Sequence, residues 1–308
     1  MICSAFIKEY AMRKHLFSIL YGLILLGFTV YVALDSFVLV RIYDAEGSSS
    51  LSIPPVSGLQ PTAEPALITA SSYQDANIAL TLTEYREHDT TIYVADVMLT
   101  SPALLKTALA QDAFGRNVTE KTSAMAERTE AILAVNGDYY GSRERGYVVR
   151  NGVIYRESSM GYDALAIMAD GSFRIVKEGE ISAAELVDAG AVQILSFSPG
   201  LVVDGSIAVT EADEVGKAMA DNPRTAIGMI EPLHYVLIVS DGRTRDSEGL
   251  TLKELAEFMQ ALGVTVGYNL DGGGSSTMVF MGEIVNNPTT NGRKITERSV
   301  SDIVYIGY

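Results

Sequence analysis

The stretch GYNLDGGGSSTMVFM, Gly267–Met281, says more about the fold than any other part of the chain. An apolar run rises to Asp271, three glycines follow, and Ser275, Ser276 and Thr277 precede a second apolar run. Two interpretations fit this pattern. Hairpin turns often use glycine where positive φ is needed, which favours a simple turn between two strands. A backbone without side-chain cover also lets a polar substrate approach the main chain closely, beside the carboxylate and the hydroxyls.

Well-known glycine and serine motifs do not match this stretch. A nucleotide P-loop needs Gly-Lys-Ser/Thr at the start of a helix, and here no lysine follows the glycines. No Gly-x-Ser-x-Gly nucleophile motif occurs in the chain. The three histidines, His15, His88 and His234, stand far apart in the sequence, which disfavours a Ser-His-Asp triad and a histidine-rich zinc site.

The segment before the stretch predicts a strand–helix–strand unit. Thr251 and Glu254 have the spacing of a capping box, and the residues at 252–262 place their apolar side chains on one helical face. Gly263 is a typical C-terminal stop for this helix. The apolar run 264–270 is then a strand that leads into the glycines.

Short strands dominate the prediction for the rest of this domain. The pattern predicts strands at 77–85, 91–98, 131–135, 147–153, 165–168, 194–197, 201–203, 226–230, 235–239, 277–281 and 303–306. It predicts shorter helices at 101–110, 120–130 and 182–189. The expected fold class is therefore α+β, a mixed β-sheet with flanking helices.

The N-terminal part of the chain has the pattern of a membrane anchor. Residues 1–15 are basic and 16–34 contain no charge, so a helix over these 19 residues would be about 28 Å long, close to the hydrocarbon thickness. The positive-inside rule predicts a cytoplasmic tail at 1–15, a signal-anchor span at 16–40 and an extracellular remainder. A cleavable signal peptide is the alternative. Residues 41–75, rich in Ser and Pro, are a predicted flexible linker, and 76–308 are the predicted domain.

Composition excludes several classes of protein. The 308 residues carry a net charge of −15, which disfavours nucleic acid as a partner. Cys3 is the single cysteine, so the chain has no intrachain disulfide and the predicted domain has no cysteine nucleophile or thiolate metal site.

Three carboxylates stand out because each follows an apolar strand. They are Asp138 in AILAVNGD, Asp241 in YVLIVSDG and Asp271 in YNLDGGG. If these strand ends lie on one side of the domain, the carboxylates converge. Paired carboxylates hydrolyse glycosidic bonds, one as the proton donor and the other as nucleophile or base. They also hold divalent cations, so the metal requirement stays open, and three unrelated Asp-Gly turns are the remaining interpretation.

Arginines supply the complementary charge. Arg224 lies between a turn and a buried strand, and its planar guanidinium suits a phosphate or carboxylate. Arg243 and Arg245 lie beside Asp241, and Arg298 follows a loop rich in Thr and Asn.

These motifs, in this order, resemble the phosphodiester glycosidase family over residues 76–308. The matching segments are NGDYY at 136–140, RTAIG at 224–228, DGR at 241–243, LDGGGSST at 270–277, Asn286 and Arg298. The resemblance implies hydrolysis of a sugar-1-phosphodiester on the sugar side. It implies catalytic roles for Asp271, Asp241 and Asp138, and substrate binding by Asn136, Arg224, Thr225, Arg243, Gly272, Gly273, Gly274, Ser275, Ser276 and Arg298.

The sequence therefore predicts a membrane-anchored extracellular glycosidase that acts on a GlcNAc-1-phosphodiester-like sugar. A cell-envelope glycan with phosphodiester-linked sugars is the expected substrate, and a divalent cation is an optional cofactor. The alternative is a non-catalytic module that binds phosphorylated glycan or assists exopolysaccharide assembly. A metal-dependent phosphodiesterase, which would cleave on the phosphate side, is a third hypothesis.

Overall fold

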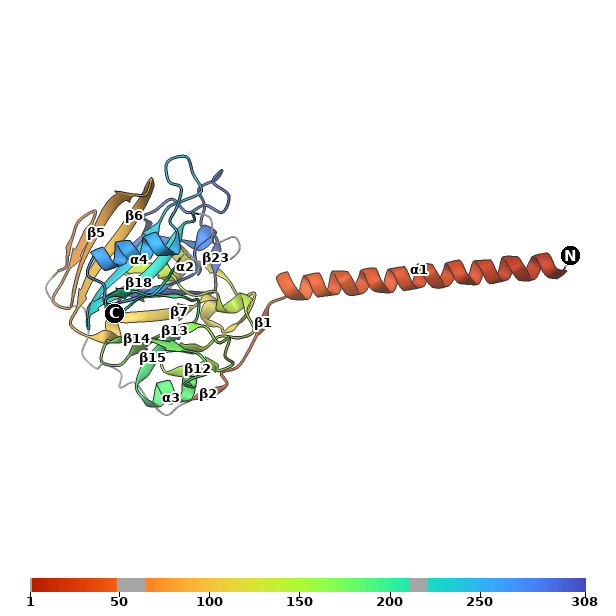
Figure 1. Cartoon of the computed structure of the whole chain (residues 1–308), viewed down its shortest axis with the longest axis horizontal. Helices are drawn as coiled ribbons and strands as arrows, with labels where there is room; N and C mark the ends of the chain where they lie inside the picture. Colours follow the sequence, from red (N-terminus) through yellow and green to blue (C-terminus); the bar gives the residue numbers. More distant parts are fainter. Residues whose placement is uncertain (1, 49–64, 211–220) are drawn as a thin grey trace. The chain divides into compact units, whose positions relative to one another are not determined.

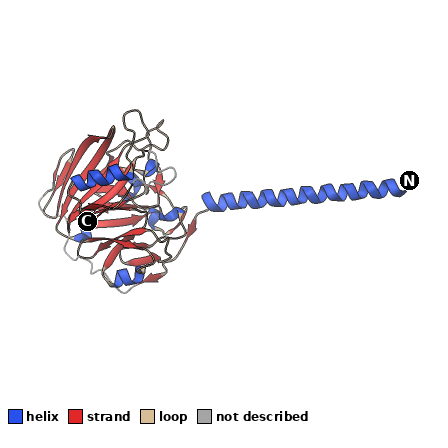
Figure 2. Ribbon diagram, in the orientation of Figure 1, coloured by secondary structure: helices blue, strands red, loops and turns tan. Residues whose placement is uncertain are grey.

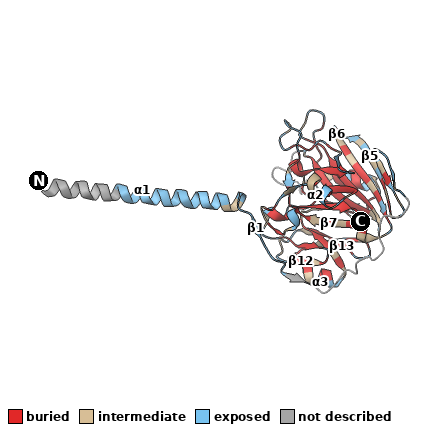
Figure 3. Cartoon of the chain, turned by 180° about the vertical axis from the view of Figure 1, so that it is seen from behind, coloured by how far each residue is buried: buried red, intermediate tan, exposed pale blue. Residues whose placement is uncertain are grey.

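The computed structural model describes residues 2–48, 65–210 and 221–308, and the chain forms two compact units, residues 1–41 and 42–308. The first unit contains α1 (Ile2–Phe37). Within α1, His15–Phe37 has a mean hydropathy of 2.2 over 23 residues, so its length and composition suit a membrane span. The described side chains of this stretch are mostly exposed, as expected for an apolar helix outside a protein core (Figure 3).

Strands dominate the second unit (Figure 2). Within its described residues the largest sheet has nine strands in the order β17-β16-β20-β18-β19-β6-β5-β4-β3. These strands are β3 (Leu67–Ile68), β4 (Ser72–Gln74), β5 (Ile78–Glu87), β6 (Thr90–Leu99), β16 (Gly200–Val203), β17 (Ser206–Ile207), β18 (Arg224–Glu231), β19 (His234–Ser240) and β20 (Val266–Asn269).

Two smaller sheets complete the main architecture of the described domain. A five-stranded sheet has the order β22-β21-β10-β24-β7, with β7 (Leu105–Leu109), β10 (Leu133–Asn136), β21 (Met278–Phe280), β22 (Glu283–Ile284) and β24 (Asp302–Ile306). A six-stranded sheet has the order β14-β13-β15-β11-β12-β2, with β2 (Gly47–Ser48), β11 (Val148–Arg150), β12 (Val153–Arg156), β13 (Asp163–Met168), β14 (Phe173–Lys177) and β15 (Ala191–Leu195). The remaining short strands are β1 (Arg41–Ile42), β8 (Gly115–Arg116), β9 (Glu120–Lys121) and β23 (Ser299–Val300).

The main core lies between the inner face of the nine-stranded sheet and the two smaller sheets. Leu237 and Val239 of β19 contribute to it from one side, and Leu133, Val304 and Leu165 from the other. The alternate residues of β19, such as Val236 and Ile238, join a second core beneath α4. This alternation is why residues 235–239 of β19 are all apolar: both faces of the strand are covered.

Helix α4 (Leu252–Ala261) covers the outer face of the nine-stranded sheet (Figure 1). Its capping box is formed as predicted: Glu254 N donates to Thr251 Oγ1 at 3.1 Å, and Thr251 N donates to Glu254 Oε2 at 2.9 Å. Met259 fits closely because β18 and β20 present Gly228 and Gly267 to it; a Cβ at either glycine would lie 2.9 Å from Met259 Cε. Burying Met259 contributes about 1.5–3 kcal/mol.

The other helices are α2 (Thr122–Arg128) and α3 (Ala183–Asp188). Both were predicted, and so was the α+β class, which is confirmed. The predicted helix at 101–110 is wrong: a short 3-10 turn is followed by β7. Within β7 the buried residues alternate, Leu105, Thr107 and Leu109, which is a strand period rather than a helical one.

Ordered structure also begins before residue 76, within the segment predicted as a linker. Strands β3 and β4 pair along the edge of the nine-stranded sheet. Tyr73 is buried in the main core, and its hydroxyl donates to Asp75 Oδ2 at 2.8 Å. Strand β2 pairs with β12. Residues 49–64 of the predicted linker lie outside the described residues.

Candidate active site

The glycine-rich stretch connects two different sheets. Strand β20 before it belongs to the nine-stranded sheet, whereas β21 after it pairs with β10 in the five-stranded sheet. The hairpin interpretation is therefore wrong, and Asp271–Thr277 form a crossover loop at the junction of the sheets. Asp271 lies at the point where the chain leaves the first sheet.

The glycines are required by neighbouring loops of the protein itself. A Cβ at Gly272 would lie 2.8 Å from Pro223 O, and one at Gly274 would lie 2.5 Å from Thr290 Oγ1. Gly273 has φ +63°, and its N–H donates to Pro223 O at 2.7 Å. The absence of side chains thus brings the segments around Pro223 and Thr290 against the loop.

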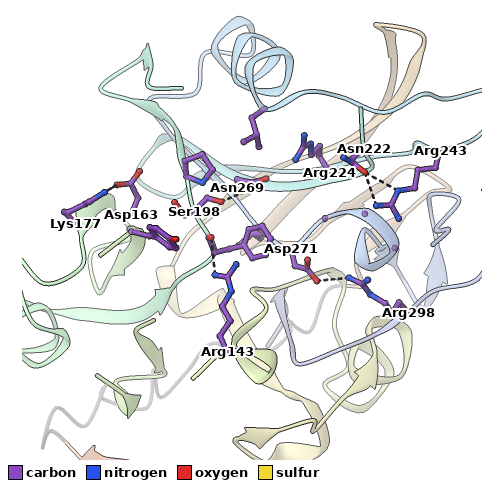
Figure 4. Close-up of a pocket in the computed structure, with 18 residues that line it drawn as sticks. Arg143, Asp163, Lys177, Ser198, Asn222, Arg224, Arg243, Asn269, Asp271 and Arg298 are labelled. Carbon is purple, nitrogen blue, oxygen red and sulfur yellow. Dashed lines mark hydrogen bonds and ion pairs between the residues drawn. The ribbon is translucent and has the colours of Figure 1, made fainter. Parts of the chain in front are cut away.

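A cavity of about 710 Å³ lies over this loop (Figure 4). Its described lining residues are Arg143, Tyr162, Asp163, Lys177, Phe197, Ser198, Pro199, Asn222, Arg224, Arg243, Leu252, Asn269, Leu270, Asp271, Gly272, Gly273, Gly274 and Arg298. Of the predicted site residues, the lining contains Asp271, Arg224, Arg243, Arg298 and the three glycines. Figure 4 shows Lys177 and Asp163 on one side and Arg243 with Asn222 on the other, with Asp271 between them.

Cationic side chains outnumber carboxylates in the described lining. Five of its residues are Arg or Lys, and only Asp163 and Asp271 are acidic. The chain as a whole has the opposite balance, with a net charge of −15. A local excess of positive charge within an acidic protein attracts anions to this cavity.

Asp271 is held on both its backbone and its side chain. Its carbonyl accepts from Asn136 Nδ2 at 2.6 Å, and its N–H donates to Gly137 O at 3.1 Å. Its Oδ2 accepts from Arg298 Nη2 at 3.3 Å, and Arg298 Nε donates to Ser275 Oγ at 2.9 Å. Burial raises the pKa of Asp271, and the hydrogen bond from Ser275 and the Arg298 charge oppose that rise.

Arg243 and Arg298 face each other across the glycines. Burial lowers the pKa of Arg243, and the positive charge of Arg298 lowers it further. Arg243 is oriented by Asn222, whose Oδ1 accepts from Nη2 at 2.9 Å, and by Thr290 O, which accepts from Nη1 at 2.6 Å. Two guanidinium groups held this close create a position where an anion would relieve their repulsion.

Arg224, Thr225 and Asn136 are fixed by buried hydrogen bonds. Arg224 Nε donates to Leu250 O at 2.7 Å, so the guanidinium is oriented at the start of β18. Thr225 Oγ1 donates to Asn136 Oδ1 at 2.8 Å, and the same oxygen accepts from Thr277 N at 3.2 Å. Thr225 and Asn136 lie outside the lining and connect β18, β10 and the end of the loop.

Asp241 also lies outside the lining of the cavity. Its Oδ1 accepts from Asn287 N at 2.8 Å and Asn286 Nδ2 at 3.3 Å, and its Oδ2 accepts from Asn287 Nδ2 at 2.9 Å. Asn286 in turn donates to Ser276 O at 3.0 Å. Asp241 therefore supports the loop from behind, and the structure does not bring it to the position of Asp271.

Asp138 is completely buried and forms a different cluster. Its side chain has no exposed surface, and its Oδ2 lies 3.1 Å from Arg150 Nη2. Arg150 also pairs with Asp302, at 2.6 Å from Nη2 to Oδ2. Ser276 is buried as well, and its Oγ has no hydrogen-bond partner within the described structure.

Sequence reasoning missed several residues of the cavity. Arg143 follows the NGDYY segment by three positions, so its proximity to that motif was a usable signal. Asp163 begins β13 and Lys177 ends β14, so they face each other at the open end of this hairpin; they carry no motif and come together only through strand pairing. Within the described residues, no group of three or more His, Cys, Asp or Glu side chains could hold a metal ion.

Comparisons with known proteins identify the family of the chain. Residues 129–307 match the phosphodiester glycosidase family. Human N-acetylglucosamine-1-phosphodiester alpha-N-acetylglucosaminidase is 35% identical over 125 residues, which is 36% of this chain and 24% of that protein. The SPbeta prophage-derived uncharacterized protein YomE of Bacillus subtilis is 28% identical over 201 residues, 63% of this chain and 31% of that protein. The chain thus matches about a quarter to a third of the length of these relatives.

A solved structure supports the same fold. The zebrafish N-acetylglucosamine-1-phosphodiester alpha-N-acetylglucosaminidase catalytic domain, auto-inhibited by its pro-peptide, superposes with a TM-score of 0.61 at 20% identity, covering 78% of this chain and 87% of that one. A hypothetical protein from Synechocystis superposes with a TM-score of 0.59 at 13% identity, covering 79% of this chain and 64% of that one. Because the family match spans more than half of the sequence, the chain belongs to the phosphodiester glycosidase family.

Proposed function

We propose that this protein hydrolyses a sugar-1-phosphodiester at the bond between the anomeric carbon and oxygen. The observation that carries this proposal is the position of Asp271 within a cavity of about 710 Å³ whose described lining is predominantly cationic. A phosphodiester is an anion, so its binding site needs positive charge. The anomeric carbon of its sugar is electrophilic, and a carboxylate can attack this carbon or activate the water that does. The name of the human relative, N-acetylglucosamine-1-phosphodiester alpha-N-acetylglucosaminidase, describes hydrolysis of a bond of the same kind.

Arg243 and Arg298, with Arg224 beside them, hold the phosphate in this mechanism. Asp271 acts on the anomeric carbon as an ionised carboxylate. It either accepts the proton of the attacking water, or bonds to the carbon as the phosphomonoester leaves; in the second case water then hydrolyses the resulting ester, which releases the free sugar, the Asp271 carboxylate and a proton to solvent. The carbon–oxygen bond breaks, and the phosphomonoester leaves with the bonding electrons. Its negative charge grows where the guanidinium groups already point.

The nature of the leaving group explains why Asp271 suffices as the catalytic carboxylate, although Asp163, paired with Lys177, also lines the cavity. Glycosidases that expel an alcohol need a second carboxyl group to protonate it. A phosphomonoester has a second pKa of about 6, so it departs as an anion at neutral pH without protonation. On this account Asp241 and Asp138 position the loop and its surroundings rather than donate a proton to the substrate.

The substrate we propose is a cell-envelope glycan with sugars linked through phosphodiesters, GlcNAc included. In this proposal α1 anchors the chain in a membrane, with residues 1–15 in the cytoplasm and the domain outside. Support comes from the basic residues that precede the apolar stretch. Fusion of a reporter enzyme active only outside the cytoplasm to Tyr308 tests this orientation: activity is expected, and its absence would contradict the topology.

The activity itself is tested with the full-length protein in detergent and an α-GlcNAc-1-phosphodiester. Free GlcNAc should accumulate with the wild type, and Asp271→Asn should lower kcat at least about hundredfold. Asp96→Asn, on β6 and not among the described lining residues, is the matched control; its side chain is half-exposed, and the amide oxygen can still accept from His234. Equal release by wild type and Asp271→Asn would remove Asp271 from the mechanism. Binding without release over a panel of sugar phosphodiesters would favour the non-catalytic glycan-binding alternative, and loss of activity in chelator would favour a metal-dependent phosphodiesterase.

A further inference from the structure

Behind the cavity lies a buried cluster of two carboxylates and one guanidinium that the proposed reaction does not use directly. Arg150 Nη2 lies 3.1 Å from Asp138 Oδ2 and 2.6 Å from Asp302 Oδ2. The side chains of both acids are fully buried, and that of Arg150 is 2% exposed. Two ionised acids sharing one cation would leave an excess negative charge in the protein interior, which is costly.

The hydrogen bonds indicate which acid carries the charge. Asp138 accepts from two backbone N–H groups, from Tyr140 on Oδ1 at 3.2 Å and from Ser196 on Oδ2 at 2.8 Å, so both of its oxygens already have donors. Asp302 accepts on Oδ2 from Arg150 only, whereas its Oδ1 has no hydrogen-bond partner within the described structure. A buried oxygen without a donor is the natural place for a proton.

The cluster is connected to both walls of the cavity. The Asp302 carboxyl lies flat against Gly137, where a Cβ would be 2.4 Å from Oδ1. Gly137 N donates to Asp302 O at 2.9 Å, and Gly137 O accepts from Asp271 N at 3.1 Å. On the other side, Asp138 holds Ser196, which precedes the lining residue Phe197.

We propose that Asp302 is a positioning residue that carries a proton in the resting protein, so that a neutral Asp138–Arg150–Asp302 cluster holds the cavity walls around Asp271. The catalytic consequences rest on the proposed function, whereas the protonation of Asp302 does not. Loss of this proton places a second negative charge between Gly137 and Arg150. That charge repels the anionic substrate and disfavours the ionised form of Asp271.

The electrostatic surroundings agree with this assignment. Burial raises the pKa of Asp302 to about 8, the charge of Asp138 raises it as the second cause, Arg150 opposes the rise, and Asp271 adds to it. Tyr140 is a further titratable group beside Asp302, and its hydroxyl donates to Ser301 O at 3.1 Å. Arg156 and Glu178, a buried cation and a buried acid of balancing charge, lie on the Asp138 side of the cluster. An acid with a raised pKa is neutral below that value and ionises as the pH rises through it, so the cluster should change charge near pH 8.

The first test is a pH profile of kcat/KM for the full-length protein in detergent. Asp302→Ala removes both the proton and the contact with Gly137, and should lower kcat/KM at pH 7 about ten- to a hundredfold. Asp302→Asn keeps the shape and remains neutral at every pH, so it should recover most of that loss. It should also abolish the decline that the wild type shows above about pH 8. Asp96→Asn should leave the wild-type profile unchanged.

The second test needs no turnover. Infrared difference spectra of the full-length protein should show a protonated carboxyl band that disappears as the pH is raised through about 8, and Asp302→Asn should lack this band. Failure of Asp302→Asn to recover activity, or a wild-type spectrum without the band, would overturn the proposal. If no substrate is hydrolysed but the band is present and assigned to Asp302, the proposed function fails while the protonated cluster stands.

Discussion

Arg298 and Asp271 are paired across the glycine-rich loop, with Nη2 of the arginine 3.3 Å from Oδ2 of the carboxylate. The side chains are 40% and 11% exposed, so the pair stands at the boundary between the cavity and the interior. Among the described lining residues no second carboxylate pairs with this guanidinium, which also donates to Ser275 Oγ. The loop carboxylate is thereby oriented toward the cavity and partly kept ionised by a cation that also faces the substrate position.

The pH dependence of hydrolysis should report this pair. Burial raises the pKa of Asp271, Ser275 and Arg298 oppose the rise, and the proposed mechanism needs the ionised form. The acid limb of kcat/KM should therefore lie above the ordinary value for Asp of about 3.9, with activity falling as the pH drops through it. Arg298→Ala removes an opposing cation and should move this limb to higher pH. A limb that moves to lower pH, or stays where it was, would contradict the pairing; Arg174→Ala, exposed on β14, is the control.

Substitution of Arg243 should weaken phosphate binding more than turnover. A hydrogen bond to a charged group contributes about 1.5–3 kcal/mol, so Arg243→Ala should raise KM roughly ten- to a hundredfold. Arg243→Lys should restore little, because its ammonium cannot bond to Asn222 and Thr290 in the planar geometry that the guanidinium adopts. The same kinetics with Arg174→Ala should match wild type. An unchanged KM in Arg243→Ala would place the phosphate elsewhere in the cavity.

The variant Asp241→Asn distinguishes a structural role of Asp241, in holding the loop, from a catalytic role. The amide group would place N–H donors against the N–H groups of Asn286 and Asn287, and each buried donor left unsatisfied costs about 1–3 kcal/mol. Urea denaturation should therefore show reduced stability, while kcat falls far less than in Asp271→Asn. Wild-type stability together with a loss of kcat as large as that of Asp271→Asn would instead indicate a direct catalytic role.

Gly274→Ala should disturb the loop through a single contact. The new Cβ would lie 2.5 Å from Thr290 Oγ1 and 3.1 Å from Thr290 Cα, so the segment that holds Arg243 must move. Overpacking of this kind costs about 1–3 kcal/mol, and KM should rise with the displaced arginine. At Gly307 a new Cβ would meet its nearest atom at an ordinary 3.5 Å, so Gly307→Ala should be mild. Equal melting temperatures and kinetics for the two variants would mean that the loop accommodates a side chain.

Much of the fold could be predicted because the local signals were strong. The capping box of Thr251 and Glu254, the stop at Gly263 and the apolar run of β19 each had one dominant interpretation, and the structure has them all. The prediction of a helix at 101–110 was wrong because the apolar pattern of so short a segment fits both the helical period and the strand period. Only the pairing of β7 with β24 makes it a strand.

Only those residues of the site that belong to recognisable motifs could be predicted from the sequence. Asp271 and the arginines at positions 224, 243 and 298 line one cavity, and they all come from the sequence motifs. Sequence could not separate Asp241 from Asp271, since both follow a buried strand. Their difference arises from Asn286 and Asn287, which reach Asp241 from a loop 45 residues away in the chain. Asp302 escaped notice because it begins an ordinary apolar strand.

The most direct test of the central claim is the fate of solvent oxygen. The full-length protein in detergent is incubated with an α-GlcNAc-1-phosphodiester in water labelled with heavy oxygen, and both products are analysed by mass spectrometry. If water attacks the anomeric carbon beside Asp271, the bond on the sugar side breaks. The label then appears in the free sugar, and the phosphomonoester stays unlabelled. Label in the phosphomonoester would mean attack at phosphorus and would contradict the mechanism.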